Sequence, residues 1–448
     1  IGIMLPYSGA HQLLFQNLSV DGIIMTSANP PGEPMIIEND KAFDLKMDCY
    51  LMHNLTIVNR CDDSVVRINS DKRAFIRKSR GFVPVPILLN HKASVLSVGA
   101  QWDVTGSVSR NGDLFLTQYI GETDKYETLR YLESAIYHLK DLLGVKKVDA
   151  VGGDKHPKYS TRIVARNLAA YFNCEFVETQ HYHAHAASLM IDCGLKEPGV
   201  FLTWDGTGYG DDGTSWGGET IVADFKSYKR VMSLRKIPLL GGDRAALDIR
   251  RIVAAIKLML RRPVTEFPES DVEVFSKMLS RSHRTSSMGR VLDALSCILD
   301  VSCKRTYEGE PAIKLERLLS LGRPTYKFDV QSDVIDGIKV IDTISLFNQL
   351  FEKQWQGERG RANIARSVVE ALVGEAGLSA CEVAKAEGIE YVGFCGGVSY
   401  NAIITDILKR TVEGQGLKFF IHDQIPNGDG GISAGQNAIV GARLDGKD

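Results

Sequence analysis

The sequence has 448 residues, of which 44% are hydrophobic and 24% charged, with a formal net charge of -2 at pH 7. A chain of this length exceeds what one hydrophobic core usually supports, so we expect two or three domains. The near-neutral charge argues against a nucleic-acid binder or a membrane-surface protein. No apolar run approaches the roughly 20 residues that a membrane span needs.

The cysteines are scattered and form no C-x-x-C pair, which argues against a zinc ribbon and against a disulfide framework. They are Cys49, Cys61, Cys174, Cys193, Cys297, Cys303, Cys381 and Cys395. This pattern predicts a reducing, cytoplasmic location. The sequence begins at Ile1 within a strand-like run, so we expect it to be a piece of a longer protein.

Residues 1–80 are predicted to form one unit of alternating short strands and turns, and residues 81–92 a linker that contains Pro and Gly. The first lobe is then expected over 93–198. Its predicted strands are 94–102, 104–109, 113–120, 148–153 and 175–180, and its predicted helices are 125–143 and 160–172. Asn111-Gly112 between two apolar runs indicates a tight hairpin, because both turn positions favour positive φ.

The same pattern starts again in a second lobe, expected over 199–448. It has a strand at 199–204, a glycine-rich turn at 205–213, a strand at 214–225, helical stretches at 243–297 and 341–387, strands at 391–397 and 418–423, and helices at 401–410 and 431–442. Two halves that each open with a hairpin predict a duplicated α/β fold with a cleft between the lobes. Opposed hairpins in such a cleft present backbone N–H groups to phosphates.

Three histidines fall within five positions of the run QHYHAHAAS, residues 180–188. The alanines that follow, and a stop at Gly194, predict a helix with a glycine C-cap. On a helix, His181 and His185 lie one turn apart on the same face, and His183 points to the opposite side. This spacing suits two imidazoles on one metal ion. The alternative is that these histidines are hydrogen-bonded core or surface groups.

A two-histidine site needs at least one more ligand, and Asp429 is the candidate for it. This aspartate lies in a loop between a predicted strand and the helix that starts near Gly431. Ligands in α/β folds gather at such strand ends. The alternative for Asp429 is a simple helix N-cap.

Two glycine-rich segments are candidates for phosphate contact. Gly208–Gly213 matches G-x-G-x-x-G, but the residues that follow indicate a strand, which excludes a Rossmann site. A hairpin that phosphates can approach remains, with a glycine-rich surface hairpin as the alternative. Gly396-Gly397 precede a predicted helix, as in sites where nucleotides meet helix N-termini. The sequence has no Walker motif.

With these segments in view, the chain from about Ala93 onward resembles the Kae/TsaD-like domain of HypF carbamoyltransferases. The matching segments are 180–188, 204–219, 239–243, 286–296, 306–316, 394–401 and 427–436. Segments 26–34, 59–67 and 76–84 resemble the C-terminal half of a YrdC-like domain. YrdC-like followed by Kae/TsaD-like is the HypF order. Antibiotic O-carbamoyltransferases reverse it, and tRNA threonylcarbamoyl enzymes keep the two domains on separate chains.

The resemblance implies an α/β fold of the actin/sugar-kinase type with a nucleotide cleft between its lobes. It implies ATP-dependent transfer of a carbamoyl group from carbamoyl-adenylate to the C-terminal cysteine thiol of HypE, in the synthesis of the cyanide ligands of [NiFe] hydrogenase. ATP and one divalent metal ion (zinc, iron or magnesium) are the implied cofactors. The acylphosphatase domain, the zinc fingers and the first half of the YrdC-like domain are missing, so we do not expect this chain alone to make carbamate or to complete an adenylation pocket.

The resemblance also implies residue roles. His181, His185 and Asp429 would hold the metal, and Asp205 would join the two histidines in catalysis. The nucleotide would be held by Asp205, Gly206, Thr207, Gly208, Asp293, Gly396, Gly397 and Asn401, and the adenylation pocket would use Ser27, Asn29, Arg67 and Arg77. Tyr182 departs from the family, which often has another histidine there, but the helix geometry places it off the ligand face.

Three alternatives remain. One is an O-carbamoyltransferase of the antibiotic-biosynthesis type. Another is a kinase-like ATP phosphotransferase, which needs a carboxylate base and no bis-histidine metal site. The third is a non-enzymatic, ATP-gated scaffold in which the metal is structural.

Overall fold

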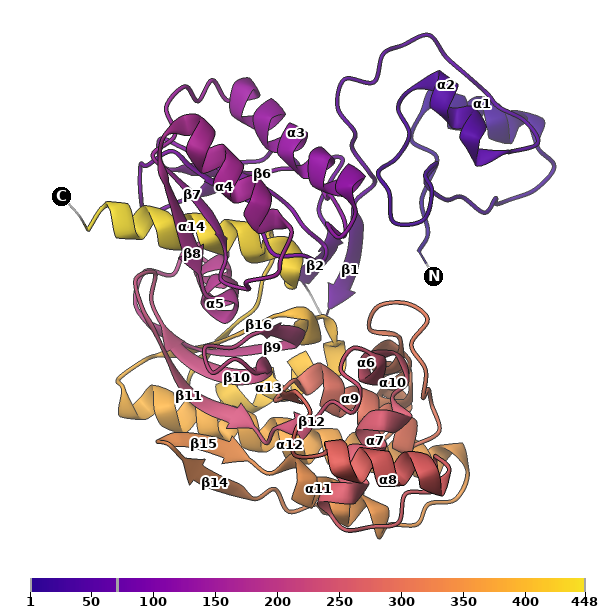
Figure 1. Ribbon diagram of the computed structural model, residues 1–448, viewed down its shortest axis with the longest axis vertical. Coiled ribbons are helices and arrows are strands. Elements are labelled where there is room, and N and C mark those ends of the chain that lie inside the picture. Colours follow the sequence, from indigo (N-terminus) through magenta and orange to yellow (C-terminus); the bar gives the residue numbers. More distant parts are fainter. Residues whose placement is uncertain (1, 70–71, 447–448) are drawn as a thin grey trace.

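The computed structural model of the chain describes residues 2–69 and 72–446. Two lobes lie one above the other, and a third unit made by the N-terminal segment lies beside the upper lobe (Figure 1). Each lobe has its own mixed sheet with helices packed against it. The predicted duplicated α/β fold is confirmed. Among the described residues, none of the helices has both the length and the apolar character needed to cross a bilayer.

The first lobe is built on a six-stranded sheet with the order β3-β6-β5-β4-β7-β8. Its strands are β3 (Ile87–Leu88), β4 (Val95–Ser97), β5 (Ser107–Arg110), β6 (Asp113–Leu116), β7 (Ala150–Asp154) and β8 (Glu175–Thr179). Its helices are α3 (Tyr126–Leu142), α4 (Thr161–Phe172) and α5 (His181–Asp192). The predicted hairpin is confirmed, since β5 pairs with β6 and both Asn111 and Gly112 have positive φ.

The second lobe is built on a larger sheet whose main path is β14-β15-β11-β10-β9-β16-β17. These strands are β9 (Gly199–Tyr209), β10 (Ser215–Ala223), β11 (Tyr228–Leu234), β14 (Ser332–Ile335), β15 (Ile338–Ile341), β16 (Tyr391–Cys395) and β17 (Lys418–Phe420), with β12 (Ile237–Pro238) and β13 (Arg284–Thr285) off the path. The helices are α6 (Arg244–Leu247), α7 (Arg250–Met259), α8 (Glu269–Met278), α9 (Met288–Ile298), α10 (Glu310–Leu321), α11 (Thr343–Phe351), α12 (Gly357–Ala386) and α13 (Ala402–Gly414).

The C-terminal helix α14 (Ile432–Leu444) returns to the first lobe, where it crosses α5 (Figure 1). Asn437 donates to the carbonyl of Val95 in β4, and Gln436 accepts from the N–H of Gly99. The sequence-based division at 198/199 grouped this helix with the second lobe. The packing of α14 on the first lobe places the preceding residues, Asp429–Gly431, near the N-terminal end of α5.

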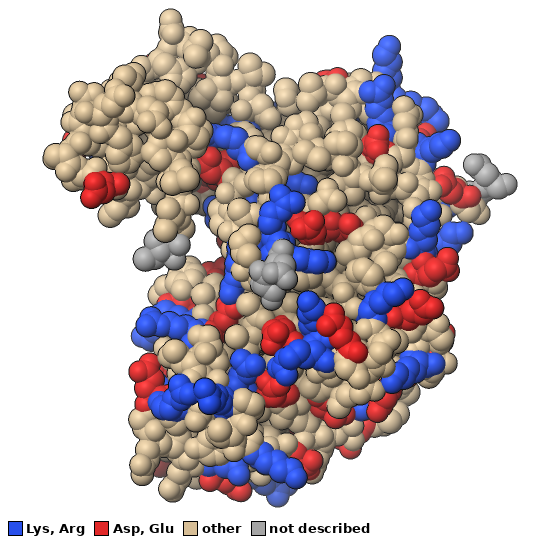
Figure 2. All heavy atoms as spheres, turned by 180° about the vertical axis from the view of Figure 1, so that it is seen from behind, with Lys and Arg blue, Asp and Glu red and all other residues tan. Residues whose placement is uncertain are grey.

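The segment before the sheets differs from the prediction of alternating strands. Residues 2–64 contain α1 (Gly9–Asn17), α2 (Asn39–Ala42) and a 3-10 turn, and only then do β1 (Val65–Asn69) and β2 (Lys72–Arg77) pair as an antiparallel ribbon. Among the described residues this segment has no sheet to pack on, so apolar side chains such as Ile24 and Leu51 are almost fully exposed. The corresponding body at the upper left of Figure 2 carries few charges.

Two further expectations are corrected. The predicted turn over 205–213 is shorter, because β9 continues through Tyr209 and pairs with β10 up to Ser215. Position 208 of this strand needs glycine, because a Cβ there would lie 2.6 Å from the Tyr182 hydroxyl oxygen. Cys297 and Cys303 form a disulfide, against the expectation of none, because the chain after α9 bends back and brings their Cα atoms to 4.5 Å.

Candidate metal and nucleotide site

The histidine run begins the helix α5, as the sequence predicts. The side chain of Gln180 caps the helix by accepting from the N–H groups of Tyr182 and His183. His183 points away from the other two histidines and donates from Nε2 to the carbonyl of Asp224 at 2.6 Å. Burial lowers the pKa of His183 to about 4, so its imidazole stays neutral at physiological pH.

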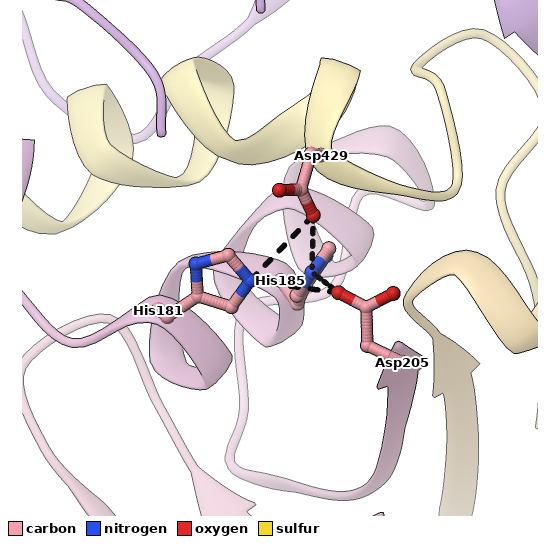
Figure 3. A group of neighbouring side chains, drawn as sticks. All are labelled: His181, His185, Asp205 and Asp429. Atoms are coloured by element: carbon pink, nitrogen blue, oxygen red, sulfur yellow. Dashed lines mark ion pairs between the residues drawn. The ribbon is translucent and has the colours of Figure 1, made fainter. Parts of the chain in front are cut away.

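His181 and His185 meet two carboxylates at the boundary of the lobes (Figure 3). Asp205 comes from β9 of the second lobe, and Asp429 from the 3-10 turn directly before α14. One ligand atom from each of the four residues lies within 4.8 Å of the others. The Nε2 atoms of both histidines are 3.5 to 3.6 Å from Asp205 Oδ2 and 3.5 Å from Asp429 Oδ1.

These four residues fit a divalent cation. Both Nε2 atoms are buried and have no hydrogen-bond partner, and such orphaned atoms are costly unless something binds them. A tetrahedral site with metal–ligand bonds of about 2.1 Å has edges of about 3.4 Å, close to the observed separations. The two carboxylates also supply the charge that balances a divalent ion. Asp205, which the sequence assigned to the nucleotide, therefore belongs to the same cluster as the predicted ligands.

The charges of the cluster depend on one another. Burial alone would lower the pKa of His181, but Asp429, Asp154 and Asp205 hold it well above its usual value. Burial is likewise outweighed at His185, whose pKa is raised by Asp205 and Asp429. Burial would raise the pKa of Asp205, but the two histidines hold it far below its usual range. The site therefore favours ionised carboxylates and positive charge between them.

Family models match the chain in three consecutive segments. A Sua5/YciO/YrdC model described as "Telomere recombination" matches residues 1–79, "HypF Kae1-like domain" matches 90–192, and "Carbamoyltransferase, Kae1-like Domain, second subdomain" matches 201–436. The last of these alone covers more than half of the sequence. The chain belongs to the HypF carbamoyltransferase family. The resemblance seen in the sequence motifs and in their order is thereby confirmed.

Individual HypF proteins match over nearly the whole chain. The probable carbamoyltransferase HypF of Methanocaldococcus jannaschii is 36% identical over 97% of this chain and 58% of its own length. The structure of full-length HypF in the phosphate- and nucleotide-bound form has a TM-score of 0.91 and 31% identity, over 99% of this chain and 59% of that one. HypF from T. kodakarensis has a TM-score of 0.85 and 36% identity, over 94% and 57%. The chain thus spans less than two thirds of these HypF proteins.

In this HypF chain, Asp205 links the metal cluster to the predicted nucleotide loops. Its Oδ1 accepts from the N–H groups of Gly206 at 2.7 Å and Gly397 at 3.2 Å, while Oδ2 faces the histidines. Gly396 has φ 91°, and a Cβ there would lie 2.3 Å from the Trp204 carbonyl oxygen. Glycine is required at this position by both conformation and space. The two glycine-rich segments therefore lie side by side next to the cluster.

The other predicted nucleotide residues have varied surroundings. Thr207 is exposed on β9. Asp293 is buried on α9 and pairs with Arg290 at 3.1 Å. The Oδ1 of Asn401 caps α13 by accepting from two backbone N–H groups, so that oxygen is already occupied.

The predicted adenylation residues are not gathered at the cluster. Asn29 donates to the carbonyls of Pro30 and Glu33 within its own turn. It belongs with Ser27 to the segment before β1, which lies apart from α5 in Figure 1. Arg67 forms a bidentate ion pair with Glu316 of α10. Arg77 lies over the ring of Tyr119, 4.6 Å from its centroid.

Asp154 is a further candidate for the site, which the sequence analysis missed. This buried aspartate ends β7, and its Oδ2 lies 2.9 Å from Nδ1 of His181. A carboxylate there holds the proton on Nδ1 and leaves Nε2 free to bind metal. The available signal was its position at the carboxyl end of a buried parallel strand.

We expect Asp154→Asn to weaken metal binding by about 10- to 100-fold, because the amide removes the charge that makes His181 a strong ligand. Competition against a chromogenic chelator measures this. Asp192→Asn is the matched control, since Asp192 pairs with His422 Nδ1 at the same 2.9 Å outside the cluster. Equal affinities of the Asp154→Asn variant and the unaltered protein would contradict the assignment.

Proposed function

We propose that this chain carries the carbamoyl-transfer step of a HypF protein that acts in the cytoplasm. The donor is carbamoyl-adenylate, and the acceptor is the C-terminal cysteine thiol of HypE, in the synthesis of the cyanide ligands of [NiFe] hydrogenase. The observation that carries the proposal is the cluster of His181, His185, Asp205 and Asp429 beside two glycine-rich loops. A similar HypF structure described as phosphate- and nucleotide-bound supports ATP as the nucleotide.

A divalent ion bound by these four residues would neutralise phosphate oxygens and orient the adenylate. Asp205 would bind the ion through Oδ2, while its Oδ1 accepts from the Gly206 and Gly397 N–H groups, so one side chain would hold the ion next to the glycine-rich loops. The two histidines are buried, whereas Asp429 is partly exposed, so the cluster has a dry side on α5 and a side that a ligand can reach. Binding and orientation are the tasks of this chain's residues.

Cys395, which directly precedes Gly396, and Cys193, at the C-terminal end of α5, are poor nucleophiles. Burial raises the pKa of Cys193 to about 12, and it raises the pKa of Cys395 well above its usual value. Both therefore remain thiols at neutral pH, whereas the thiolate is the reactive form. This supports a nucleophile supplied by another protein.

The test combines the metal-loaded chain, carbamoyl-adenylate and HypE. Mass spectrometry should find one carbamoyl group on the C-terminal cysteine of HypE, and none on a variant with serine there. Transfer at the same rate with a metal-stripped chain, or no transfer with any metal tried, would contradict the proposal.

We expect metal affinity to rise with pH. In the metal-free protein the carboxylates raise the pKa of both ligand histidines, so the metal must displace protons from them. Each displaced proton changes the apparent affinity by about tenfold per pH unit. The gain continues until the pH passes the raised pKa values and then levels off. Zinc titrations across a pH series measure this, and an affinity independent of pH would contradict it.

A further inference from the structure

Tyr400 joins three segments that are far apart in the sequence. Its hydroxyl donates to the carbonyl of Phe75 in β2 at 2.7 Å and accepts from the N–H of Gly428 at 3.2 Å. Gly428 directly precedes the metal ligand Asp429, and Tyr400 itself follows Gly396-Gly397 in the same loop. One phenol therefore connects the N-terminal ribbon, the nucleotide loop and the metal loop.

The β1–β2 ribbon holds the same nucleotide loop at two further points. Asn69 of β1 donates to the carbonyl of Tyr400 at 3.1 Å. Arg67 pairs with Glu316, whose Oε1 also accepts from the N–H of Ala402 in the first turn of α13 at 2.8 Å. Because these bonds meet at both the tyrosine and the following helix, the ribbon and the loop cannot move independently without breaking several of them.

The ribbon also reaches the first lobe through the last residue of β2. Arg77 covers the ring of Tyr119, whose hydroxyl donates to Asp103 at 2.9 Å. The carbonyl of Asp103 lies 3.3 Å from the position of a Cβ on Gly430, in the metal loop. The N-terminal unit therefore approaches the metal loop by two routes. One runs through Tyr400 of the second lobe, and the other through Tyr119 and Asp103 of the first lobe.

We propose that Tyr400 is a positioning residue that couples the β1–β2 ribbon to ligand occupancy at the metal and nucleotide loops. The coupling rests on the proposed function for the identity of the ligands, ATP and a divalent metal. When Asp429 binds the ion, the Gly428 N–H is held in place, and Tyr400 passes that constraint to Phe75. Arg67, paired with Glu316, serves as an anchor of the ribbon and not as a phosphate ligand.

Amide hydrogen exchange of the full chain, with and without zinc and a non-hydrolysable ATP analogue, tests the coupling. In the unaltered protein, loading should slow exchange in α5 and in the metal loop, and also in the ribbon. In Tyr400→Phe, α5 and the metal loop should still respond, while the response of the ribbon should be clearly smaller, because only the Asn69 and Arg67 contacts to the loop then remain. The variant should also bind zinc about tenfold more weakly, because the Gly428 N–H loses its partner.

Tyr391→Phe is the matched control, because it removes a hydroxyl that donates to the Glu197 carbonyl at 2.6 Å in the same lobe and touches neither loop. Its ribbon should respond as in the unaltered protein. A ribbon that responds equally in Tyr400→Phe, or that never responds in the unaltered protein although α5 does, would overturn the coupling. Failure of α5 and the metal loop to respond at all would instead contradict the proposed function.

Discussion

Replacement of both His181 and His185 by glutamine is expected to abolish metal binding in a protein that still folds. The two imidazoles are half of the ligands in the cluster, and both of their Nε2 atoms are buried without a hydrogen-bond partner. If binding of a structural zinc releases about 10–16 kcal/mol over four ligands, each ligand accounts for about 3 kcal/mol, or about a hundredfold. Elemental analysis of the purified variant and a zinc titration measure the loss.

His183→Gln is the control for this variant. Its amide nitrogen can take the place of His183 Nε2 and donate to the Asp224 carbonyl, and its side chain points away from the cluster. This protein should carry as much metal as the unaltered one. A folded double variant with full metal content would refute the ligand assignment, and loss of metal from His183→Gln alone would show that the helix face was assigned wrongly.

Gly435→Ala is expected to lower the stability of the first lobe and to release the metal. Gly435 lies where α14 crosses α5, and a Cβ there would lie 1.8 Å from the backbone oxygen of Ala184. No side-chain rotation relieves a clash with backbone, so the helices must separate, at a cost of about 3 kcal/mol. Since Ala184 is next to His185 and α14 follows Asp429 directly, separation of the helices pulls the ligands apart.

Thermal unfolding and metal content of the Gly435→Ala protein measure both effects. Gly374→Ala provides the control, because Gly374 lies in α12 and a Cβ there would meet nothing within 4 Å. That change should raise stability by about 0.5–1 kcal/mol, since alanine loses less backbone entropy in a helix. A Gly435→Ala protein with an unchanged melting temperature and full metal content would show that the crossing can relax.

Local sequence patterns predicted those parts of the fold and site that depend only on residues close together in the chain. The helix over 181–192 and the shared face of His181 and His185 follow from the 3.6-residue period and from the stop at Gly194. The Asn111-Gly112 hairpin follows from turn chemistry in the same way. The order of the motifs indicated the family, because three YrdC-like segments precede seven Kae/TsaD-like segments, as in HypF proteins.

Other parts could not be predicted because they depend on which segments meet in space. The turn assigned to Asp205 is strand, since glycine at 208 makes room for Tyr182 of α5, a partner that the strand's own sequence does not show. The cysteine spacing did not suggest the Cys297–Cys303 bond, which depends on the path of the chain after α9. The ion pair between Arg67 and Glu316, 249 residues later, is another contact that neither segment shows by itself.

The sequence by itself determined that two imidazoles share one helical face and that the chain belongs to the HypF family. Helical periodicity and turn chemistry act over a few residues, so they can be read in one dimension. The tertiary structure alone decided that Asp205 joins the predicted ligands His181, His185 and Asp429. It also decided that Asp154 contacts His181 and that the Tyr400 hydroxyl bonds to both the ribbon and the metal loop. Those contacts form only when α14 packs against α5 and β9 passes beside them, because they join residues that are far apart in the sequence.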